Sequence, residues 1–238
     1  MARPREFDES TALTAAMHCF WAKGFEATSI RDLASEMGIT GTSLYNAFGD
    51  KQSLYRRALS HYLDQSVRKR IVRLEESMPP AEAVAAFFAE IIDRSVGDRQ
   101  CKGCMLVNAA LEIAPHDLEM RRLVAAELAL IEAFFRRCIQ KAGKARVDLP
   151  AAAEAADLGR LLLTVLLGIR VLARTRAPRA LLQGAAQPAL ALLGIDFSSA
   201  PRPARVSSPR PRTRASRMSA TLRAPAQSTT RASARKHA

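Results

Sequence analysis

The sequence is poor in the residues that favour β-strands. Aromatic residues make up only 5% of the 238-residue chain, and alanine supplies much of the 48% that is hydrophobic. Alanine is the strongest helix former, whereas strands favour β-branched and aromatic side chains. The composition therefore predicts an all-α protein.

Cysteines and long apolar runs are also scarce. The chain has four cysteines, too few and too scattered for the disulfide framework of a small secreted domain. Its longest apolar run, 161–169, is well short of the roughly 20 residues that a membrane span requires. The N-terminus leads into a polar segment instead of an apolar signal core. We expect a soluble, cytoplasmic protein with no membrane partner.

Sequence patterns typical of enzymes and of metal sites are missing as well. The chain has no glycine-rich phosphate loop, no nucleophile elbow and no convincing set of metal ligands. We therefore expect a protein that is not an enzyme and that binds no cofactor and no metal.

Acidic residues are absent from the end of the chain. The net charge is +13, but residues 199–238 hold ten Lys and Arg and no Asp or Glu. The Arg, Pro, Ser and Ala composition of residues 198–238 offers too little apolar surface to fold, which predicts a disordered basic tail. Such a tail would bind DNA of any sequence by releasing counterions. A sequence-tolerant DNA-compacting protein is therefore one candidate function.

The first fifty residues contain the periodic pattern of a DNA-binding motif. Apolar positions at helical spacing predict helices over 7–23, 29–37 and 41–47, with Gly38 in the turn between the last two. Two short helices joined by a three-residue turn containing glycine form the helix-turn-helix, whose second helix lies in the major groove. The third predicted helix has few large apolar residues, which leaves short polar side chains to reach DNA. We therefore predict a helix-turn-helix domain over residues 1–50.

Further helices are expected up to residue 197. A long helix over 51–73 links the first domain to a helical domain over 74–197. The helices expected in the second domain span 81–96, 103–113, 116–142, 150–176 and 178–193. The last two have broad apolar faces that include Leu161, Leu162, Val165, Leu166, Leu190 and Leu193. More apolar surface than one small domain can bury favours a helical homodimer interface.

Two segments, TSIRDLA at 28–34 and GITGTSLYNAFGDK at 38–51, resemble the N-terminal signature of TetR-family transcriptional regulators. The resemblance covers about residues 7–62. It implies an N-terminal helix-turn-helix followed by a helical ligand-binding and dimerisation domain. It also implies a homodimeric repressor that binds a double-stranded DNA operator and responds to an unknown small-molecule effector.

The same resemblance assigns DNA contacts by position. Thr28 and Thr40 match helix-start positions that meet the DNA backbone, and Tyr45 and Lys51 match residues that usually contact phosphates. The remaining implied contacts, to bases or phosphates, are Gly41, Thr42, Ser43 and Asn46. Gly41 offers no side chain for reading a base, and Ala47 stands where many relatives carry a histidine that contacts the backbone.

Residues 103–112 are similar to a stretch in one branch of the family, where it begins a helix beside the effector pocket. This similarity implies a set of pocket candidates: Phe87, Phe88, Met105, Asn108 and Phe134. Core packing is the alternative role for each of them. Asn108 stands out because a polar group in an apolar helix needs a partner.

The pair Cys101-x-x-Cys104 allows three interpretations. It can be part of the core. It can be a thiol sensor, because a helix N-terminus and the nearby Arg99 and Lys102 would lower a thiol pKa. It can be half of a zinc site with His116, although a structural zinc site needs four ligands and no second cysteine pair exists.

Overall fold

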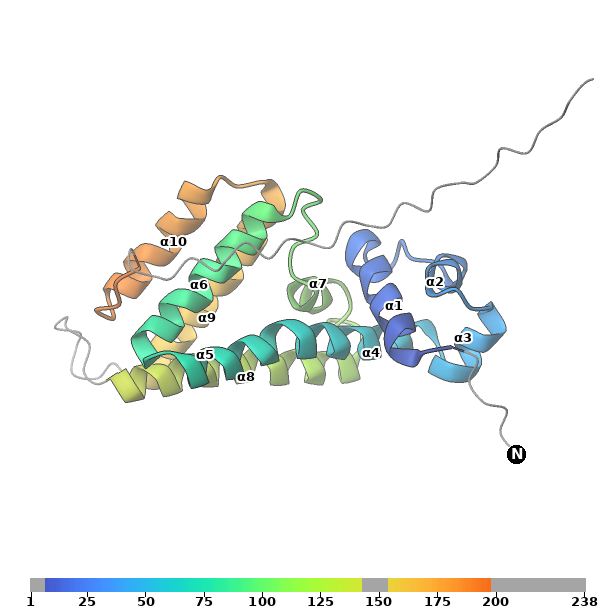
Figure 1. Ribbon diagram of the computed structural model, residues 1–238, viewed down its shortest axis with the longest axis horizontal. Coiled ribbons are helices and arrows are strands. Elements are labelled where there is room, and N and C mark those ends of the chain that lie inside the picture. Colours follow the sequence, from blue (N-terminus) through green and yellow to red (C-terminus); the bar gives the residue numbers. More distant parts are fainter. Residues whose placement is uncertain (1–6, 143–153, 198–238) are drawn as a thin grey trace, which may run out of the picture. The chain divides into compact units, whose positions relative to one another are not determined.

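The computed structural model describes residues 7–142 and 154–197, and every regular element within these ranges is helical (Figure 1). The all-α prediction is therefore confirmed. The helices are α1 (Glu9–Lys23), α2 (Ile30–Met37), α3 (Gly41–Phe48), α4 (Lys51–Leu63), α5 (Lys69–Ser77), α6 (Pro80–Gly97), α7 (Met105–Glu112), α8 (Leu118–Ala142), α9 (Ala155–Leu172) and α10 (Arg179–Ala191). None of the helices in these ranges is long and apolar enough to cross a membrane. The predicted basic tail, 198–238, lies outside the described residues.

Polar side chains cap the starts of α2, α3 and α4. The Ser29 hydroxyl accepts a 3.0 Å hydrogen bond from the Asp32 N–H, and the Asp32 carboxylate accepts one of 3.0 Å from the Ser29 N–H. Thr40 and Asp50 each accept a hydrogen bond from the N–H three residues later. These caps satisfy amide groups that the first turn of a helix leaves without a partner. They therefore determine where the three helices begin.

Aromatic and leucine side chains form the core that holds α1 to α4 together. The ring of Phe20 in α1 packs edge-on against Tyr55 of α4 with centroids 4.9 Å apart, and Phe25 meets the same ring at 5.3 Å. Leu33 of α2 and Leu44 of α3 are completely buried. This packing gives α2 and α3 a defined orientation on the frame made by α1 and α4.

The helix predicted over 51–73 is longer than expected. A π-helical turn, Asp64–Arg68, joins α4 to α5 without a break, and α5 ends at Ser77. Helix α8 runs beside this segment (Figure 1), and an ion pair between Arg68 and Glu127 links the two. No local feature of the sequence marks the π turn, which adds one residue to a turn of an otherwise regular helix.

The same hydrophobic core continues among α6, α8, α9 and α10. Phe87 and Phe88 of α6 are buried there. Helix α9 approaches α8 closely at Gly159, where an added Cβ would lie 3.3 Å from the carbonyl oxygen of Glu132. The helix predicted over 150–176 is described from Ala155 to Leu172, followed by a short 3₁₀ turn.

Candidate nucleic-acid interface

Helix α3 has one buried face and one exposed face. Leu44 and Phe48 are buried, whereas Thr42, Tyr45 and Asn46 are exposed, and Tyr45 retains 52% of its surface. Because residues three and four apart share a face of a helix, the three exposed side chains form one short polar surface. A surface of this kind suits the helix that enters a DNA major groove.

The start of α3 is tied together by two hydroxyl groups. The Ser43 N–H donates a 3.1 Å hydrogen bond to the Thr40 hydroxyl, which donates one of 2.9 Å to the Ser43 hydroxyl. Thr40 is exposed, whereas Ser43 is half-buried. A Cβ added at Gly41 would meet nothing within 4 Å. The fold therefore does not require glycine at position 41. Because glycine has no side chain, the backbone at the start of α3 is open to close approach by another molecule.

Lys51 joins α4 to the loop between α1 and α2. Its ammonium nitrogen lies 3.4 Å from the carbonyl oxygen of Glu26 and 4.3 Å from the centroid of the Phe25 ring. An ammonium group has three N–H donors, so a single carbonyl partner leaves donors for a phosphate. Lys51 thus stays a predicted phosphate contact.

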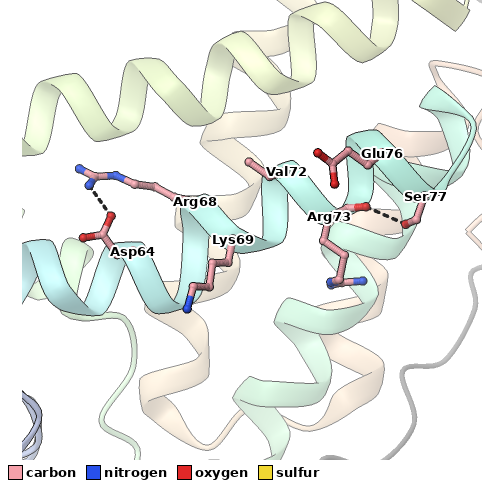
Figure 2. A pocket seen from close by; sticks show the side chains of 7 residues that line it. All are labelled: Asp64, Arg68, Lys69, Val72, Arg73, Glu76 and Ser77. Atoms are coloured by element: carbon pink, nitrogen blue, oxygen red, sulfur yellow. Dashed lines mark hydrogen bonds and ion pairs between the residues drawn. The ribbon is translucent and has the colours of Figure 1, made fainter. Parts of the chain in front are cut away.

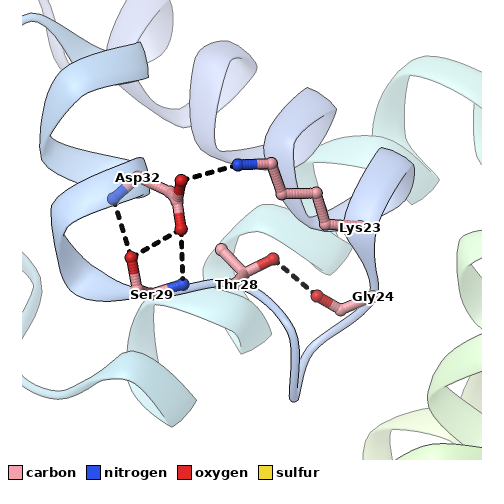
Figure 3. A network of polar contacts seen from close by, with 5 residues as sticks. All are labelled: Lys23, Gly24, Thr28, Ser29 and Asp32. Atoms are coloured by element: carbon pink, nitrogen blue, oxygen red, sulfur yellow. Dashed lines mark hydrogen bonds and ion pairs between the residues drawn. The ribbon is translucent and has the colours of Figure 1, made fainter.

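Thr28 does not lie where the resemblance implies. Its side chain is completely buried, and its hydroxyl donates a 2.6 Å hydrogen bond to the carbonyl oxygen of Gly24 (Figure 3). The structure is therefore at odds with a DNA contact from this side chain, which instead closes the loop between α1 and α2. The adjacent Ser29 is exposed. The sequence shows two neighbouring hydroxyl residues but not which of them turns inward.

An ion pair fixes α2 against α1 (Figure 3). The Lys23 ammonium lies 2.6 Å from the Asp32 carboxylate, which also accepts hydrogen bonds from Ser29. The hydrogen bond from Lys23, followed by those from Ser29, holds the pKa of Asp32 well below its usual range. The carboxylate therefore stays ionised at neutral pH, where it caps α2 and holds Lys23.

Two family models match consecutive parts of the chain. Residues 12–58 match the model described as bacterial regulatory proteins of the tetR family, and residues 80–188 match the C-terminal domain of LmrA/YxaF-like transcriptional regulators. The chain belongs to the TetR family. The family that the motifs at 28–34 and 38–51 indicate is therefore confirmed, and the second match extends it to the C-terminal helices.

Individual TetR-type proteins align over most of their length. The HTH-type transcriptional regulator YezE of Bacillus subtilis (strain 168) is 31% identical over 170 residues, which are 69% of this chain and 88% of YezE. The HTH-type transcriptional repressor ComR of Escherichia coli (strain K12) is 28% identical and aligns over 74% of this chain and 83% of ComR. A solved structure of a cysteine mutant of the TetR-family regulator CifR, complexed with 26 bp operator DNA, is 37% identical. It superimposes with a TM-score of 0.67 over 79% of this chain and 98% of that one.

The predicted effector-pocket phenylalanines of this TetR-family protein are packed against one another. The ring centroid of Phe87 lies 5.4 Å from that of Phe134, and the ring centroid of Phe88 lies 5.6 Å from that of Phe135. Phe135 is not among the pocket candidates predicted from the sequence. Met105 is 1% exposed. None of these side chains lines the open hollow along residues 64–77 or the small cavity between α6, α8 and the residues after α10. The rings fill the space between the helices, so the effector pocket stays a prediction.

Asn108 has two protein partners. Its amide nitrogen donates a 3.1 Å hydrogen bond to the carbonyl oxygen of Lys102, and its amide oxygen accepts one of 2.6 Å from Arg174. The partner that a buried amide requires is thus supplied within the chain. Asn108 joins the loop before α7 to the 3₁₀ turn that follows α9.

Helix α7 contacts the helix-turn-helix part of the TetR-family protein at both of its ends. Beside its start, the indole N–H of Trp21 donates a 3.2 Å hydrogen bond to the carbonyl oxygen of Gly103. At its end, the Glu112 carboxylate accepts a 3.3 Å hydrogen bond from the Phe25 N–H. Figure 1 shows α7 between α1 and the C-terminal helices. A shift of α7 would therefore move groups on α1 and on the loop that follows it.

Cys101 and Cys104 lie in and at the end of the loop before α7. Cys101 is half-buried with a left-handed φ of 53°, and Cys104 is the buried residue that precedes the first turn of α7. Over residues 7–142 and 154–197, no group of three or more His, Cys, Asp or Glu side chains is placed to hold a metal ion. The zinc interpretation with His116 therefore gains no support.

An open hollow of about 490 Å³ lies on the exposed side of the α4–α5 segment (Figure 2). It is lined by Asp64, Arg68, Lys69, Val72, Arg73, Glu76 and Ser77. Charged side chains dominate this surface, and Arg68 and Asp64 already pair at 2.7 Å. The hollow contains none of the predicted effector-pocket residues and is a groove on one helical segment.

Proposed function

We propose that this TetR-family protein is a repressor that binds a specific double-stranded operator as a homodimer through α3. The observation that carries the proposal is the exposed polar face of α3, with Thr42, Tyr45 and Asn46 opposite the buried Leu44 and Phe48. Phosphate contacts position such a helix, and contacts to base edges give it sequence preference. Thr42 and Asn46 are the proposed base-reading residues, and Tyr45 and Lys51 are the proposed phosphate contacts.

The relatives support this proposal. CifR is similar over nearly its whole length and has been solved on operator DNA, and ComR is a repressor. A repressor acts by occupying its operator, so the protein would work beside the chromosome in the cytoplasm.

The proposed dimer interface consists of exposed stripes on α9 and α10. It differs from the apolar faces expected from the sequence, because Leu162, Leu166, Leu190 and Leu193 are buried within the protomer. Leu181 on α10 and Leu192, the residue directly after it, are half exposed, and between them lies Gly184, where an added Cβ would meet nothing within 4 Å. On α9, Val171 is exposed next to the equally open Gly168. In both helices the spacing puts these residues on one face. Apolar side chains beside glycines allow a second copy of the chain to pack its helices closely against this face.

The open space at Gly184 provides a test of the dimer. Gly184→Gln should leave the folded protomer intact, because the side chain points into empty space and glutamine is the better helix former. In the dimer the same side chain would collide with the partner, so sedimentation should show monomers and operator affinity should fall. Gly97→Gln is the matched control, because Gly97 is equally open at the end of α6. A fully dimeric Gly184→Gln protein would contradict this interface.

The response to an effector is proposed to pass through α7. The hydrogen bonds of Gly103, in the loop before α7, and of Glu112, at its end, connect the helical domain to α1 and to the α1–α2 loop. An effector that prefers a different position of α7 would shift the population towards dimers whose α3 helices no longer match the operator.

The function is tested by selecting bound fragments from a pool of random and genomic DNA. We expect an inverted repeat to be enriched. Retention of all fragments with equal affinity would contradict the proposal and would favour the DNA-compacting alternative, in which the basic residues of 199–238 dominate binding.

A further inference from the structure

Four polar side chains from four helices and their flanks meet in the interior next to α7. Arg170 of α9 donates hydrogen bonds to the Ser95 hydroxyl (3.2 Å) and the Tyr62 hydroxyl (3.5 Å). The Tyr62 hydroxyl in turn donates to the Cys104 sulfur at 3.8 Å. Arg170, Tyr62 and Cys104 are 8%, 5% and 7% exposed. The donors thus form a chain that starts at a guanidinium and ends on a sulfur atom.

The charge of Arg170 has no carboxylate partner among the residues that the structure describes. The ion pairs found in these ranges do not include it. The other buried arginine nearby, Arg70, pairs with Glu90 at 3.0 Å, so that carboxylate is already engaged. An isolated buried cation is costly unless an anion compensates it. The neighbours of Arg170 leave two acidic groups for this task, Tyr62 and Cys104.

Of these two groups, the Cys104 thiol is the more acidic. Burial raises the pKa of Tyr62 to about 12, so its hydroxyl keeps the proton with which it bonds the sulfur. Burial also raises the pKa of the Cys104 thiol. The positive charge of Arg170, together with the hydrogen bond from Tyr62, outweighs burial and lowers the pKa of Cys104 from its ordinary value.

The pKa values of two other buried cysteines are shifted in the opposite direction. Burial raises the pKa of Cys138 to about 11, and it also raises that of Cys19. Cys138 is 4% exposed and Cys104 is 7% exposed, so the two thiols differ little in exposed surface, although Cys138 also borders a small cavity. They differ in that Arg170 faces Cys104. Cys138 is therefore an internal control within the same chain.

We propose that Cys104 is a thiolate held by Arg170 and Tyr62, that it is oxidised by small peroxides, and that its oxidation weakens the DNA-binding state. The thiolate attacks one oxygen of hydrogen peroxide. A sulfur–oxygen bond forms as the oxygen–oxygen bond breaks, and hydroxide leaves. The sulfur loses two electrons and becomes a sulfenic acid, and the peroxide is reduced. Cys104 is only 7% exposed, which favours a small oxidant over a bulky one.

Tyr62 connects this reaction to the helix-turn-helix. Its ring packs edge-on against Trp21 of α1 with centroids 5.1 Å apart, and the Trp21 N–H is bonded to Gly103, the residue before Cys104. An oxygen added to the sulfur must displace the Tyr62 hydroxyl, and the Tyr62 ring then loses its fit against Trp21. The oxidation of the thiolate stands by itself. Only the effect on operator affinity rests on the proposed function.

The thiolate is tested with dilute peroxide on the full chain, followed by mass spectrometry of each cysteine. Cys104 should be oxidised at least about tenfold faster than Cys138 at neutral pH, because each unit of pKa changes the thiolate fraction tenfold. Arg170→Met should remove this difference, and Arg170→Lys should restore part of it. Because Arg170→Met can unfold the core, the ultraviolet absorbance of the thiolate is also titrated in a variant that retains only Cys104. Equal oxidation of Cys104 and Cys138, or a thiolate that appears only at alkaline pH, would overturn the assignment.

The transmission is tested by fluorescence, because Trp21 is the only tryptophan in the chain. Peroxide should change the emission of the parent and lower its operator affinity by about tenfold or more, within the range typical of coupled sites. Neither change should occur in Cys104→Ser, whereas Cys101→Ser should behave like the parent. Oxidised Cys104 with unchanged emission would overturn the link to α1. Failure of the reduced parent to select any operator would instead refute the proposed function and leave the thiolate result standing.

Discussion

The indole N–H of Trp21 donates a hydrogen bond to the backbone carbonyl of Gly103 across 3.2 Å, which joins α1 to the loop before α7. Gly103 has a left-handed φ of 71°, and an added Cβ would lie 2.9 Å from the side chain of Arg174. The loop therefore lies between Trp21 and Arg174, and the Gly103 carbonyl has a fixed position for the hydrogen bond from Trp21. This contact and the one from Glu112 at the end of α7 connect α7 and its preceding loop to the DNA-binding part of the chain.

Replacing Trp21 by Phe tests the strength of this connection. The smaller ring keeps an aromatic surface against Tyr62 but leaves the carbonyl oxygen of Gly103 without its donor. We expect the free energy of unfolding to fall by about 1–2 kcal/mol, since one part-buried hydrogen bond and some ring contact are lost. Urea denaturation followed by circular dichroism measures the change. Coincident unfolding curves for Trp21→Phe and the parent would show that the contact contributes nothing.

The capping box before α2 gives a second prediction. Ser29→Ala should lower the free energy of unfolding by about 1 kcal/mol, because the Asp32 N–H loses its acceptor. Ser35→Ala is the matched control, since Ser35 is an exposed residue within the same helix. Thermal unfolding of both variants decides the question, and equal midpoints would speak against the cap.

The low pKa of Asp32 predicts a pH dependence with a definite sign. The folded carboxylate releases its proton at lower pH than the unfolded one, so it stabilises the fold fully above the unfolded pKa. This stabilisation is lost as the pH falls through the folded pKa. We therefore expect the parent to lose stability between roughly pH 5 and pH 2 more steeply than Asp32→Asn. Denaturation curves at several pH values provide the comparison, and parallel pH profiles would be inconsistent with the ion pair to Lys23.

Much of the helix-turn-helix was predictable because its determinants are local. Ser29, Thr40 and Asp50 each cap a helix whose first turn follows directly in the sequence, and the α2 capping box joins two residues only three apart. The burial of Thr28 could not be predicted, because a loop hydroxyl carries no sign of the direction in which it turns.

The environment of Cys104 could not be predicted from the sequence, for a different reason. The motif drew attention to the charges of Arg99 and Lys102, but Arg170 from a distant helix supplies the neighbouring cation. Lys102 instead lies 4.6 Å from the centroid of the Trp21 ring. Contacts between helices far apart in the sequence depend on packing, which periodicity alone does not determine.

The roles of the α3 and α4 residues can be separated by how each substitution changes the affinity for operators of different DNA sequence. Lys51→Ala and Tyr45→Phe should weaken binding to all operator variants about equally, because phosphates are the same in every sequence. Substitutions of Thr42 or Asn46 should change the preference at particular base pairs by about 1–3 kcal/mol. Lys69→Ala, an exposed lysine on α5, is the control. Affinities measured on a panel of single-base operator variants would contradict the assignment if Lys51→Ala bound like the control.

Footprinting of the purified protein on its selected operator tests the central claim most directly. A homodimer that uses two α3 helices should protect an inverted repeat whose half-sites are centred about one helical turn, roughly 34–36 Å, apart or slightly more. Gly184→Gln should lose this paired protection while retaining its fold. Protection of a single unpaired half-site by the parent, or uniform protection of the whole fragment, would contradict the account.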